Sequence, residues 1–311
     1  MKCLITGANG FIGSHLVQHL LGQNHSVAAI AHQQSDFISS LKGDINIACG
    51  DLLDNSFINS QIKEHQPDII YHLAAQSLPQ VAWNEPAQTF RTNFISSLKL
   101  FESAKQQSPP PLIITLSSSS VYASGKQDVP LSEESPIQPG SIYAASKLAM
   151  EQLAGNFIDT MGLKIIIVRP FFIIGPRKEG DVSSDFARGI VGIEQGKASE
   201  LHVGNLKNTR DFLDVHDAVA ALWQIAMNGK TGAVYNICSG RGHTIGDLLA
   251  IFKKNAQQPV KIVKDPVKIR SIDDPFKIGD PAKLLALGWK PQIDLEKSVI
   301  SILDYWRGRL K

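Results

Sequence analysis

Seven short apolar runs are spaced along the chain and separated by polar or amphipathic stretches. Strands buried by helices on both faces of a parallel sheet are continuously apolar, and these runs have that character. They predict strands at residues 1–5, 25–31, 45–49, 67–73, 112–116, 164–169 and 233–237. Amphipathic patterns predict a helix from about residue 15 onwards and further helices at 88–106, 141–160, 185–195, 214–227 and 295–306. The chain is therefore expected to belong to the α/β class.

Three glycines follow the first predicted strand at a spacing of three residues, in the segment ITGANGFIG. Gly7 allows a tight turn, Gly10 allows close approach of a diphosphate, and Gly13 allows the next helix to pack on the strand. The N-terminus of that helix presents free N–H groups and its positive dipole end to the phosphates. A strand, a glycine turn and a helix in this order predict a bound dinucleotide.

The alternation of strands and helices loosens after Pro170. We expect a dinucleotide-binding domain at residues 1–170, which also receives about 211–238. Residues 171–210 and 239–311 are expected to form a substrate-binding lobe. The predicted fold is a Rossmann-type doubly wound parallel sheet with a smaller, mixed C-terminal lobe.

The end of the second predicted strand decides which dinucleotide is expected. NAD-specific sites usually have an acid here, which accepts hydrogen bonds from a ribose hydroxyl. Ala31, His32 and Gln33 supply no acid to repel a 2′-phosphate, and His32 is able to donate to one, although no arginine is present at these positions. We expect NADP(H) to be preferred, with NAD(H) as the alternative.

The composition is ordinary for a globular protein: 43% of the 311 residues are hydrophobic, 19% are charged, and the formal net charge is +2. Charges are interspersed, so neither nucleic acid nor a membrane is expected as a partner. The three cysteines are odd in number and show no motif spacing, so they suggest neither a disulfide framework nor a metal site. The early glycine turn leaves no room for a signal peptide, and no apolar stretch has transmembrane length, so a cytoplasmic protein is expected.

Two Tyr-x-x-x-Lys segments occur, and only one lies in a predicted helix. Tyr122 to Lys126 lies in a loop, where a spacing of four residues has no geometric meaning. Tyr143 to Lys147 opens a strongly helical segment, and residues four apart on a helix share a face. We interpret the first as a coincidence. Without the glycine turn, the second would be an ordinary surface pair; with it, we interpret the two side chains as neighbours in one cleft.

This second pair suits proton transfer to a carbonyl oxygen. A free tyrosine titrates near 10, and a neighbouring Lys147 cation is expected to lower the pKa of Tyr143. Tyr143 would then serve as proton donor and acceptor for a hydroxyl/carbonyl pair. A hydroxyl from the serines at the end of the fifth predicted strand, Ser117 to Ser120, is expected to hydrogen-bond the same oxygen.

The glycine spacing, the serine-ended strand and the Tyr143–Lys147 segment together resemble the extended short-chain dehydrogenase/reductase family, over essentially the whole chain. The resemblance implies that Ser118, four residues before Tyr122, is the catalytic hydroxyl beside Tyr143 and Lys147. The cofactor-binding residues expected are Gly7, Gly10, Phe11, Ile12, Gly13, His32, Asp51 on the adenine side, Leu52, Leu73, Ala74, Ala75, Tyr143 and Lys147.

Segments of the C-terminal half are similar to the group of GDP-mannose 4,6-dehydratases and GDP-4-keto-6-deoxy-mannose reductases. The similar segments are 203–206, 210–212, 235–240, 278–280 and 288–289, and Arg270 with Asp273. By this resemblance Arg210 and Arg270 bind the diphosphate of a nucleotide sugar, and Asp273 binds its ribose hydroxyls. Taken singly, each arginine is equally explained by a surface ion pair. The other expected substrate contacts are Ser119, Ser120 and Asn205.

Two positions bear on the choice between reduction and dehydration. Dehydratases of this group have carboxylates directly after the catalytic hydroxyl, where this chain has Ser119 and Ser120. A serine has no carboxylate with which to remove the proton next to the keto carbon, so elimination is disfavoured. Reduction needs only a hydride from the cofactor and a proton from Tyr143. One family asparagine that helps to hold the nucleotide sugar is replaced by Phe172.

The expected function is NAD(P)H-dependent reduction of a GDP-linked 4-keto-6-deoxy sugar to the 4-hydroxy sugar. The alternatives are a nucleotide-sugar 4-epimerase with tightly bound NAD, a 4,6-dehydratase and a non-catalytic NADP-sensing protein. The family resemblance also suggests a homodimer formed through the predicted helices at 88–106 and 141–160.

Overall fold

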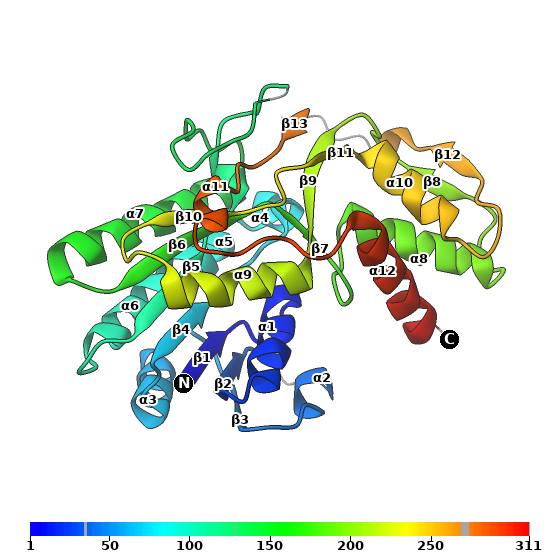
Figure 1. The fold of residues 1–311 in the computed structure, drawn as a ribbon. Helices are drawn as coiled ribbons and strands as arrows, with labels where there is room; N and C mark the ends of the chain where they lie inside the picture. The colour runs from blue at the N-terminus through cyan, green and yellow to red at the C-terminus, as the bar shows by residue number, and fades with distance from the viewer. Residues whose placement is uncertain (34–35, 128, 269–273, 311) are drawn as a thin grey trace.

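A parallel sheet of seven strands forms the centre of the protein (Figure 1). The computed structural model describes residues 1–33, 36–127, 129–268 and 274–310. The strand order is β10-β6-β5-β4-β1-β2-β3, which reverses between β4 and β1 as in doubly wound folds. The predicted α/β fold is thus confirmed. The strands are β1 (Lys2–Thr6), β2 (Ser26–Ala31), β3 (Ile45–Cys49), β4 (Ile69–His72), β5 (Leu112–Leu116), β6 (Ile165–Pro170) and β10 (Val234–Ile237).

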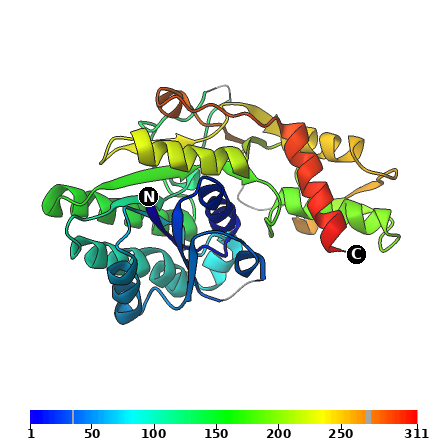
Figure 2. The ribbon, with the colours of Figure 1, turned by 60° about the horizontal axis from the view of Figure 1, so that its bottom comes forward.

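Helices cover both faces of this sheet, which explains the continuously apolar strands (Figures 1 and 2). Buried side chains such as Leu16 on one face and Phe101 on the other fill the space between the layers. One face carries α1 (Phe11–Gly22), α2 (Asp36–Ser39) and α9 (Val215–Asn228), and the other carries α3 (Asn55–His65), α6 (Ser96–Lys105) and α7 (Ile142–Met161).

A second lobe has a hydrophobic core of its own, on the right of Figure 1. It contains α8 (Val182–Glu194), α10 (Ile245–Lys254), α12 (Leu295–Arg309) and the paired strands β8 (Leu201–Val203) and β12 (Ile262–Lys264). A small separate sheet joins β9 (Thr209–Asp214) to β7 (Phe172–Ile174), β11 (Gly242–Thr244) and β13 (Phe276–Lys277). Because β9 leads directly into α9, the chain returns to the central sheet at this point. In the described part of the chain, no helix is long and apolar enough to cross a membrane.

The helix expected over residues 88–106 is interrupted. It consists of α5 (Pro86–Phe90), a π-helical turn η1 (Arg91–Ile95) and α6. A π turn adds a residue to one turn and so rotates the faces that follow it. The apolar face expected from the sequence is correspondingly split: Phe101 is fully buried, Phe94 and Leu98 are half-buried, and Phe90 is exposed. The remaining short elements are α4 (Pro79–Asn84), α11 (Ala282–Leu285), η2 (Ser119–Val121) and η3 (Pro266–Lys268).

Candidate active site

The glycine turn between β1 and α1 forms a cradle of exposed backbone. Gly7 has a φ of +70°, and a Cβ atom there would lie 2.7 Å from the backbone nitrogen of Ala74. A Cβ atom at Gly13 would lie 2.1 Å from the Gly7 oxygen, so only glycine lets α1 pack this closely. Gly10 caps α1 without a side-chain hydrogen bond, which leaves the first N–H groups of the helix open for a diphosphate. The turn therefore fits a dinucleotide.

Other expected cofactor residues lie at the same edge of the sheet. Phe11 and Ile12 are the first residues of α1, and Leu73, Ala74 and Ala75 follow β4 against the glycine turn.

The residues expected on the adenine side follow β2 and β3. The Gly50 amide donates to the Ala31 carbonyl at 3.0 Å, which joins the ends of these strands. His32 is exposed directly after β2, and Leu52 is half-buried after β3. The Asp51 carboxylate accepts a hydrogen bond from the Leu53 amide at 2.8 Å, which fixes its side chain next to the strand ends.

The three expected catalytic residues are brought together beyond the end of β5. Ser118 caps η2, and its hydroxyl is hydrogen-bonded to the Tyr143 phenol. Tyr143 and Lys147 lie one turn apart in α7, and the Lys147 ammonium donates to the Leu116 carbonyl at 2.7 Å. All three side chains are buried. The site thus holds a hydroxyl, a phenol and a cation in one place, which suits proton donation to a bound carbonyl.

The expected cause of Tyr143 activation is wrong in one respect. Burial raises the pKa of Tyr143 above 10, and the Ser118 hydrogen bond opposes this rise. Burial also lowers the pKa of Lys147 from 10.5 to about 8, while the Glu151 carboxylate raises it. Desolvation disfavours the charged form of each group and outweighs the attraction expected between phenolate and ammonium. Tyr143 is therefore a protonated donor at neutral pH, and Lys147 is the group that titrates near it.

Serine hydroxyls occupy the two positions after Ser118. Ser118 donates to the Ser120 hydroxyl at 3.1 Å, and the Ser120 amide donates back to Ser118 at the same distance. Ser119 is buried behind them. Ser120 orients Ser118 through these two bonds, and neither Ser119 nor Ser120 offers a carboxylate as a base for elimination.

A buried hydrogen-bond network supports this site and was not expected from the sequence. The ring nitrogens of His72 lie 2.8 Å from the Thr6 and Ser97 hydroxyls. Burial lowers the pKa of His72 to about 3, so the ring is neutral. Ser97 donates to the Asn93 carbonyl at 2.7 Å, and the Asn93 amide donates to Ser146 of α7 at 2.9 Å. The network joins β1, the strand before the glycine turn, to α7, which contains Tyr143 and Lys147. The π turn that holds Asn93 has no recognisable sequence signal.

Four of the six expected substrate residues are described: Ser119 and Ser120 next to Ser118, and Arg210 and Asn205 in the second half of the chain. Arg210 is buried in β9, donates to the Thr209 carbonyl at 2.9 Å, and lies 5.1 Å from the centroid of the Phe172 ring. Asn205 is half-buried and donates to the Asn208 side chain at 3.0 Å. The other two, Arg270 and Asp273, lie outside the described residues.

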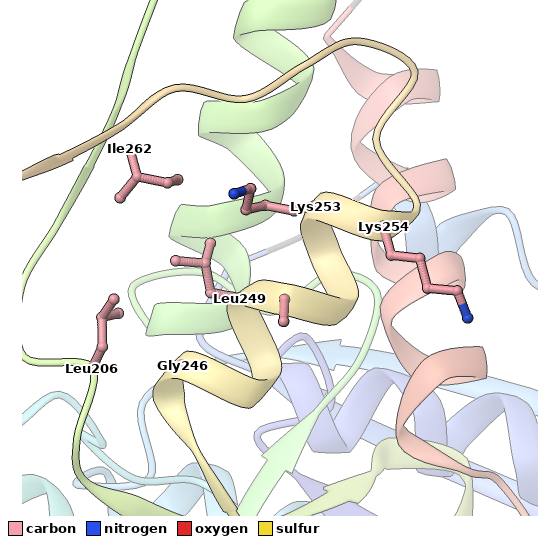
Figure 3. Close-up of a pocket in the computed structure, with 7 residues that line it drawn as sticks. Leu206, Gly246, Leu249, Lys253, Lys254 and Ile262 are labelled. Carbon is pink, nitrogen blue, oxygen red and sulfur yellow. The ribbon is translucent and has the colours of Figure 1, made fainter.

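A groove of about 530 Å³ is a separate feature of the second lobe (Figure 3). It includes none of the catalytic residues, and one of its two lysines, Lys254, is paired with Glu296 at 2.8 Å. The groove is lined by Leu206, Gly246, Leu249, Ala250, Lys253, Lys254 and Ile262.

The described residues include no cluster of metal-ligating side chains.

Comparison with known proteins agrees with this geometry. The sequence model of the family described as GDP-mannose 4,6 dehydratase matches residues 4–302. GDP-6-deoxy-D-mannose reductase of Pseudomonas aeruginosa is 33% identical over 314 residues, which cover 100% of this chain and 98% of that protein. The structure of RMD from P. aeruginosa complexed with NADPH has a TM-score of 0.86, at 33% identity and with 99% of both chains covered.

An epimerase is also similar. The structure of UDP-glucose 4-epimerase from Thermotoga maritima with UDP-glucose has a TM-score of 0.89, at 28% identity and with 100% of both chains covered. The expected resemblance is confirmed over nearly the whole chain. The chain belongs to the GDP-mannose 4,6-dehydratase family of extended short-chain dehydrogenases/reductases, and it is an NAD(P)-dependent nucleotide-sugar oxidoreductase.

Proposed function

We propose that this protein reduces a GDP-linked 4-keto-6-deoxy sugar to the 4-hydroxy sugar and prefers NADPH. The observation that carries the proposal is the grouping of Ser118, Tyr143 and Lys147, with serine hydroxyls where elimination needs a carboxylate. The similarity to GDP-6-deoxy-D-mannose reductase and to the NADPH complex of RMD supports both substrate and cofactor.

The protein's residues have separate parts in this reaction. The glycine turn would hold the diphosphate of a dinucleotide, which would supply the hydride when bound. Tyr143 donates a proton to the reduced carbonyl oxygen, and Ser118 holds that oxygen by a second hydrogen bond. Lys147 binds the nicotinamide ribose hydroxyls through its ammonium group. Because the three groups are preorganised in a buried site, they stabilise charge on the oxygen without first reorganising water.

The second lobe recognises the nucleotide sugar in this proposal. Residues 1–170 and about 211–238 bind the dinucleotide, and residues 171–210 and 239–311 bind the substrate. Arg210 and Arg270 bind the diphosphate, Asp273 binds the ribose hydroxyls, and Asn205 with Ser119 and Ser120 completes the contacts. The exposed Phe90 and the half-buried Phe94 and Leu98 suit the interface of a homodimer, which light scattering would detect. We also place the protein in the cytoplasm.

A second candidate is a nucleotide-sugar 4-epimerase, favoured by the similarity to the Thermotoga enzyme. An epimerase uses the same hydroxyl, tyrosine and lysine but retains its cofactor through the reaction. The purified protein would then release stoichiometric NAD⁺ on denaturation and would consume no NADPH.

A thermal-shift panel tests the substrate assignment. GDP, UDP, dTDP and CDP are each added with NADP⁺ or NAD⁺, and the unfolding temperature is recorded. Stabilisation by GDP with NADP⁺ is expected, since a ligand that binds only the folded state raises its stability. Stabilisation by UDP or dTDP but not by GDP would contradict the proposal.

A further inference from the structure

Arg177 is a half-buried cation that the catalytic residues do not contact. It lies in the loop of residues 175–181, which leads from β7 to α8 and crosses the first turn of α1. Its Nε donates to the Ser14 hydroxyl of α1 at 3.1 Å, and its guanidinium carbon lies 3.9 Å from the ring centroid of Phe37 in α2. Its φ is +69°, a value that residues other than glycine rarely adopt. The loop therefore holds this side chain in a fixed and unusual position.

The charge of Arg177 has no partner in the described part of the chain. Its Nη2 atom is buried and makes no hydrogen bond, and none of the ion pairs among the described side chains includes Arg177. Burial lowers the pKa of the guanidinium to about 10. The adjacent Lys178 is different, because it forms an ion pair with Asp181 at 3.0 Å. A buried donor without an acceptor destabilises a protein, and a bound anion would satisfy it.

The surroundings of Arg177 indicate which anion this is. The side-chain amide of Asn9, in the glycine turn, donates to the Gln33 carbonyl just after β2. Phe37, on which Arg177 stacks, belongs to the helix that follows the same connection. In dinucleotide-binding folds the ribose 2′ position lies between the glycine turn and the end of β2. Arg177 thus approaches this region from the second lobe, while His32 and Gln33 provide no permanent charge there.

We infer that Arg177 binds the 2′-phosphate of NADP(H) and selects it over NAD(H). A guanidinium matches phosphate oxygens with paired N–H groups, and Nη2 is the donor that lacks an acceptor. NAD(H) has a neutral hydroxyl at this position and gains nothing from the cation. The inference rests on the NADPH preference proposed above but not on the identity of the sugar nucleotide.

The dissociation constants of NADP⁺ and NAD⁺, measured by calorimetry on the full-length protein, test this role. Arg177→Met keeps the apolar stem on Phe37 but removes the charge. It should weaken NADP⁺ binding about tenfold or more, as expected for loss of a charge-assisted contact, and change NAD⁺ binding less than about twofold. Arg177→Lys should retain most of the preference. The loss should shrink at high salt, because exposed phosphate contacts are screened.

Fragments and a matched variant separate this role from a structural one. In the wild type, 2′,5′-ADP should bind more tightly than 5′-ADP, and Arg177→Met should abolish the difference. Arg188→Met removes another arginine stacked on an aromatic ring, 5.1 Å from Trp306, and should leave both cofactors unaffected. Equal weakening of NADP⁺ and NAD⁺ would show that Arg177 contacts the shared diphosphate or only holds the loop. That result, or unchanged binding of both, overturns the inference. If Arg177→Met does not fold, Arg177→Gln and the wild-type fragment comparison decide the question.

Discussion

Two segments of this chain have the same Tyr-x-x-x-Lys spacing but different structures. In α7 the spacing is one helical turn, and Tyr143 and Lys147 lie buried beside Ser118. In the loop after η2, Tyr122 is buried and donates to the Asn236 side chain at 2.7 Å. Lys126 is exposed, and its backbone forms an isolated β-bridge with Val129. The predicted difference in local structure is confirmed: Tyr143 and Lys147 share one face of a helix, and Tyr122 and Lys126 lie in a loop.

Electrostatics alone would not distinguish the two tyrosines. Burial raises the pKa of Tyr122 to about 12 and also raises that of Tyr143. Tyr122 is covered by the Arg169 guanidinium, 4.8 Å from its ring centroid, and retains 1% exposure. Tyr143 retains 9% exposure and is bonded to Ser118. Tyr143 thus differs from Tyr122 in its greater exposure and in the Ser118 hydroxyl beside it, more than in the acidity of the phenol, and this difference supports Tyr143 as the proposed proton donor.

The largest expected effect separates the two tyrosines directly. Tyr143→Phe should lower kcat for ketosugar reduction about 10²- to 10⁴-fold, because a positioned proton donor contributes that much. Tyr122→Phe should keep kcat within about twofold but lower the free energy of unfolding by about 1–3 kcal/mol, since the Asn236 oxygen loses a buried donor. Steady-state kinetics and urea unfolding measure the two effects. Similar losses of kcat in both variants would contradict the distinction.

Replacement of Lys147 should lower activity but raise stability, whereas replacement of Lys126 should change neither. Lys147→Met should lower kcat/KM about 100-fold, whereas Lys126→Met should change nothing measurable. The folded-state pKa of Lys147 is lowered from 10.5 to about 8, so the folded protein binds this proton less tightly than the unfolded chain. Near pH 7 Lys147→Met should therefore be more stable than the wild type, by up to about 3 kcal/mol at about 1.4 kcal/mol per unit.

This stability gain should depend on pH. The wild type recovers stability as pH rises from about 8 towards 10.5, where the unfolded chain still binds the proton and the folded protein does not. Urea unfolding at pH 7 and pH 10 should show the advantage of Lys147→Met decreasing. A gain that is constant across this range would mean that Lys147 is not the titrating group.

The pH profile of activity should report the same lysine. Lys147 loses its proton above about pH 8, while Tyr143 stays protonated, so kcat/KM for reduction should fall above about pH 8. In Lys147→Arg the alkaline limb should move up by at least about two units, because arginine keeps its proton. A limb that stays in place would assign the titration to Tyr143 instead.

The smallest expected effect concerns the start of the catalytic helix. The Ser141 hydroxyl caps α7 by accepting from the Ala144 amide at 3.1 Å. Ser141→Ala should cost about 1 kcal/mol of unfolding free energy, as typical N-cap losses do, with little change in kcat. Ser60→Ala, on the exposed face of α3, is the matched control and should cost less than about 0.5 kcal/mol. Denaturant titration measures both losses of unfolding free energy. Equal losses in the two variants would mean that the Ser141 cap contributes nothing.

Much of the site could be predicted because its signals are local. The glycine turn is a contiguous segment whose steric need is specific, and the clash of a Cβ at Gly7 with Ala74 shows that need in the folded protein. Helix α7 has its cap, its tyrosine and its lysine within seven residues. The Asn93 network and the contacts of Arg177 join side chains that are up to 163 residues apart, and neither has a sequence spacing that could reveal it.

The parallel sheet, the dinucleotide turn and the difference between the two Tyr-x-x-x-Lys segments follow from the amino-acid sequence, because periodicity, glycine sterics and helical spacing act over short stretches. The ionisation of the site, by contrast, depends on how the folded chain packs. Burial raises the pKa of Tyr143 and lowers that of Lys147, and desolvation depends on what packs around a group. Packing also brings Arg177, remote in sequence from the glycine turn, to Ser14 of α1 and Phe37 of α2, near the edge of the sheet where the cofactor is expected to bind.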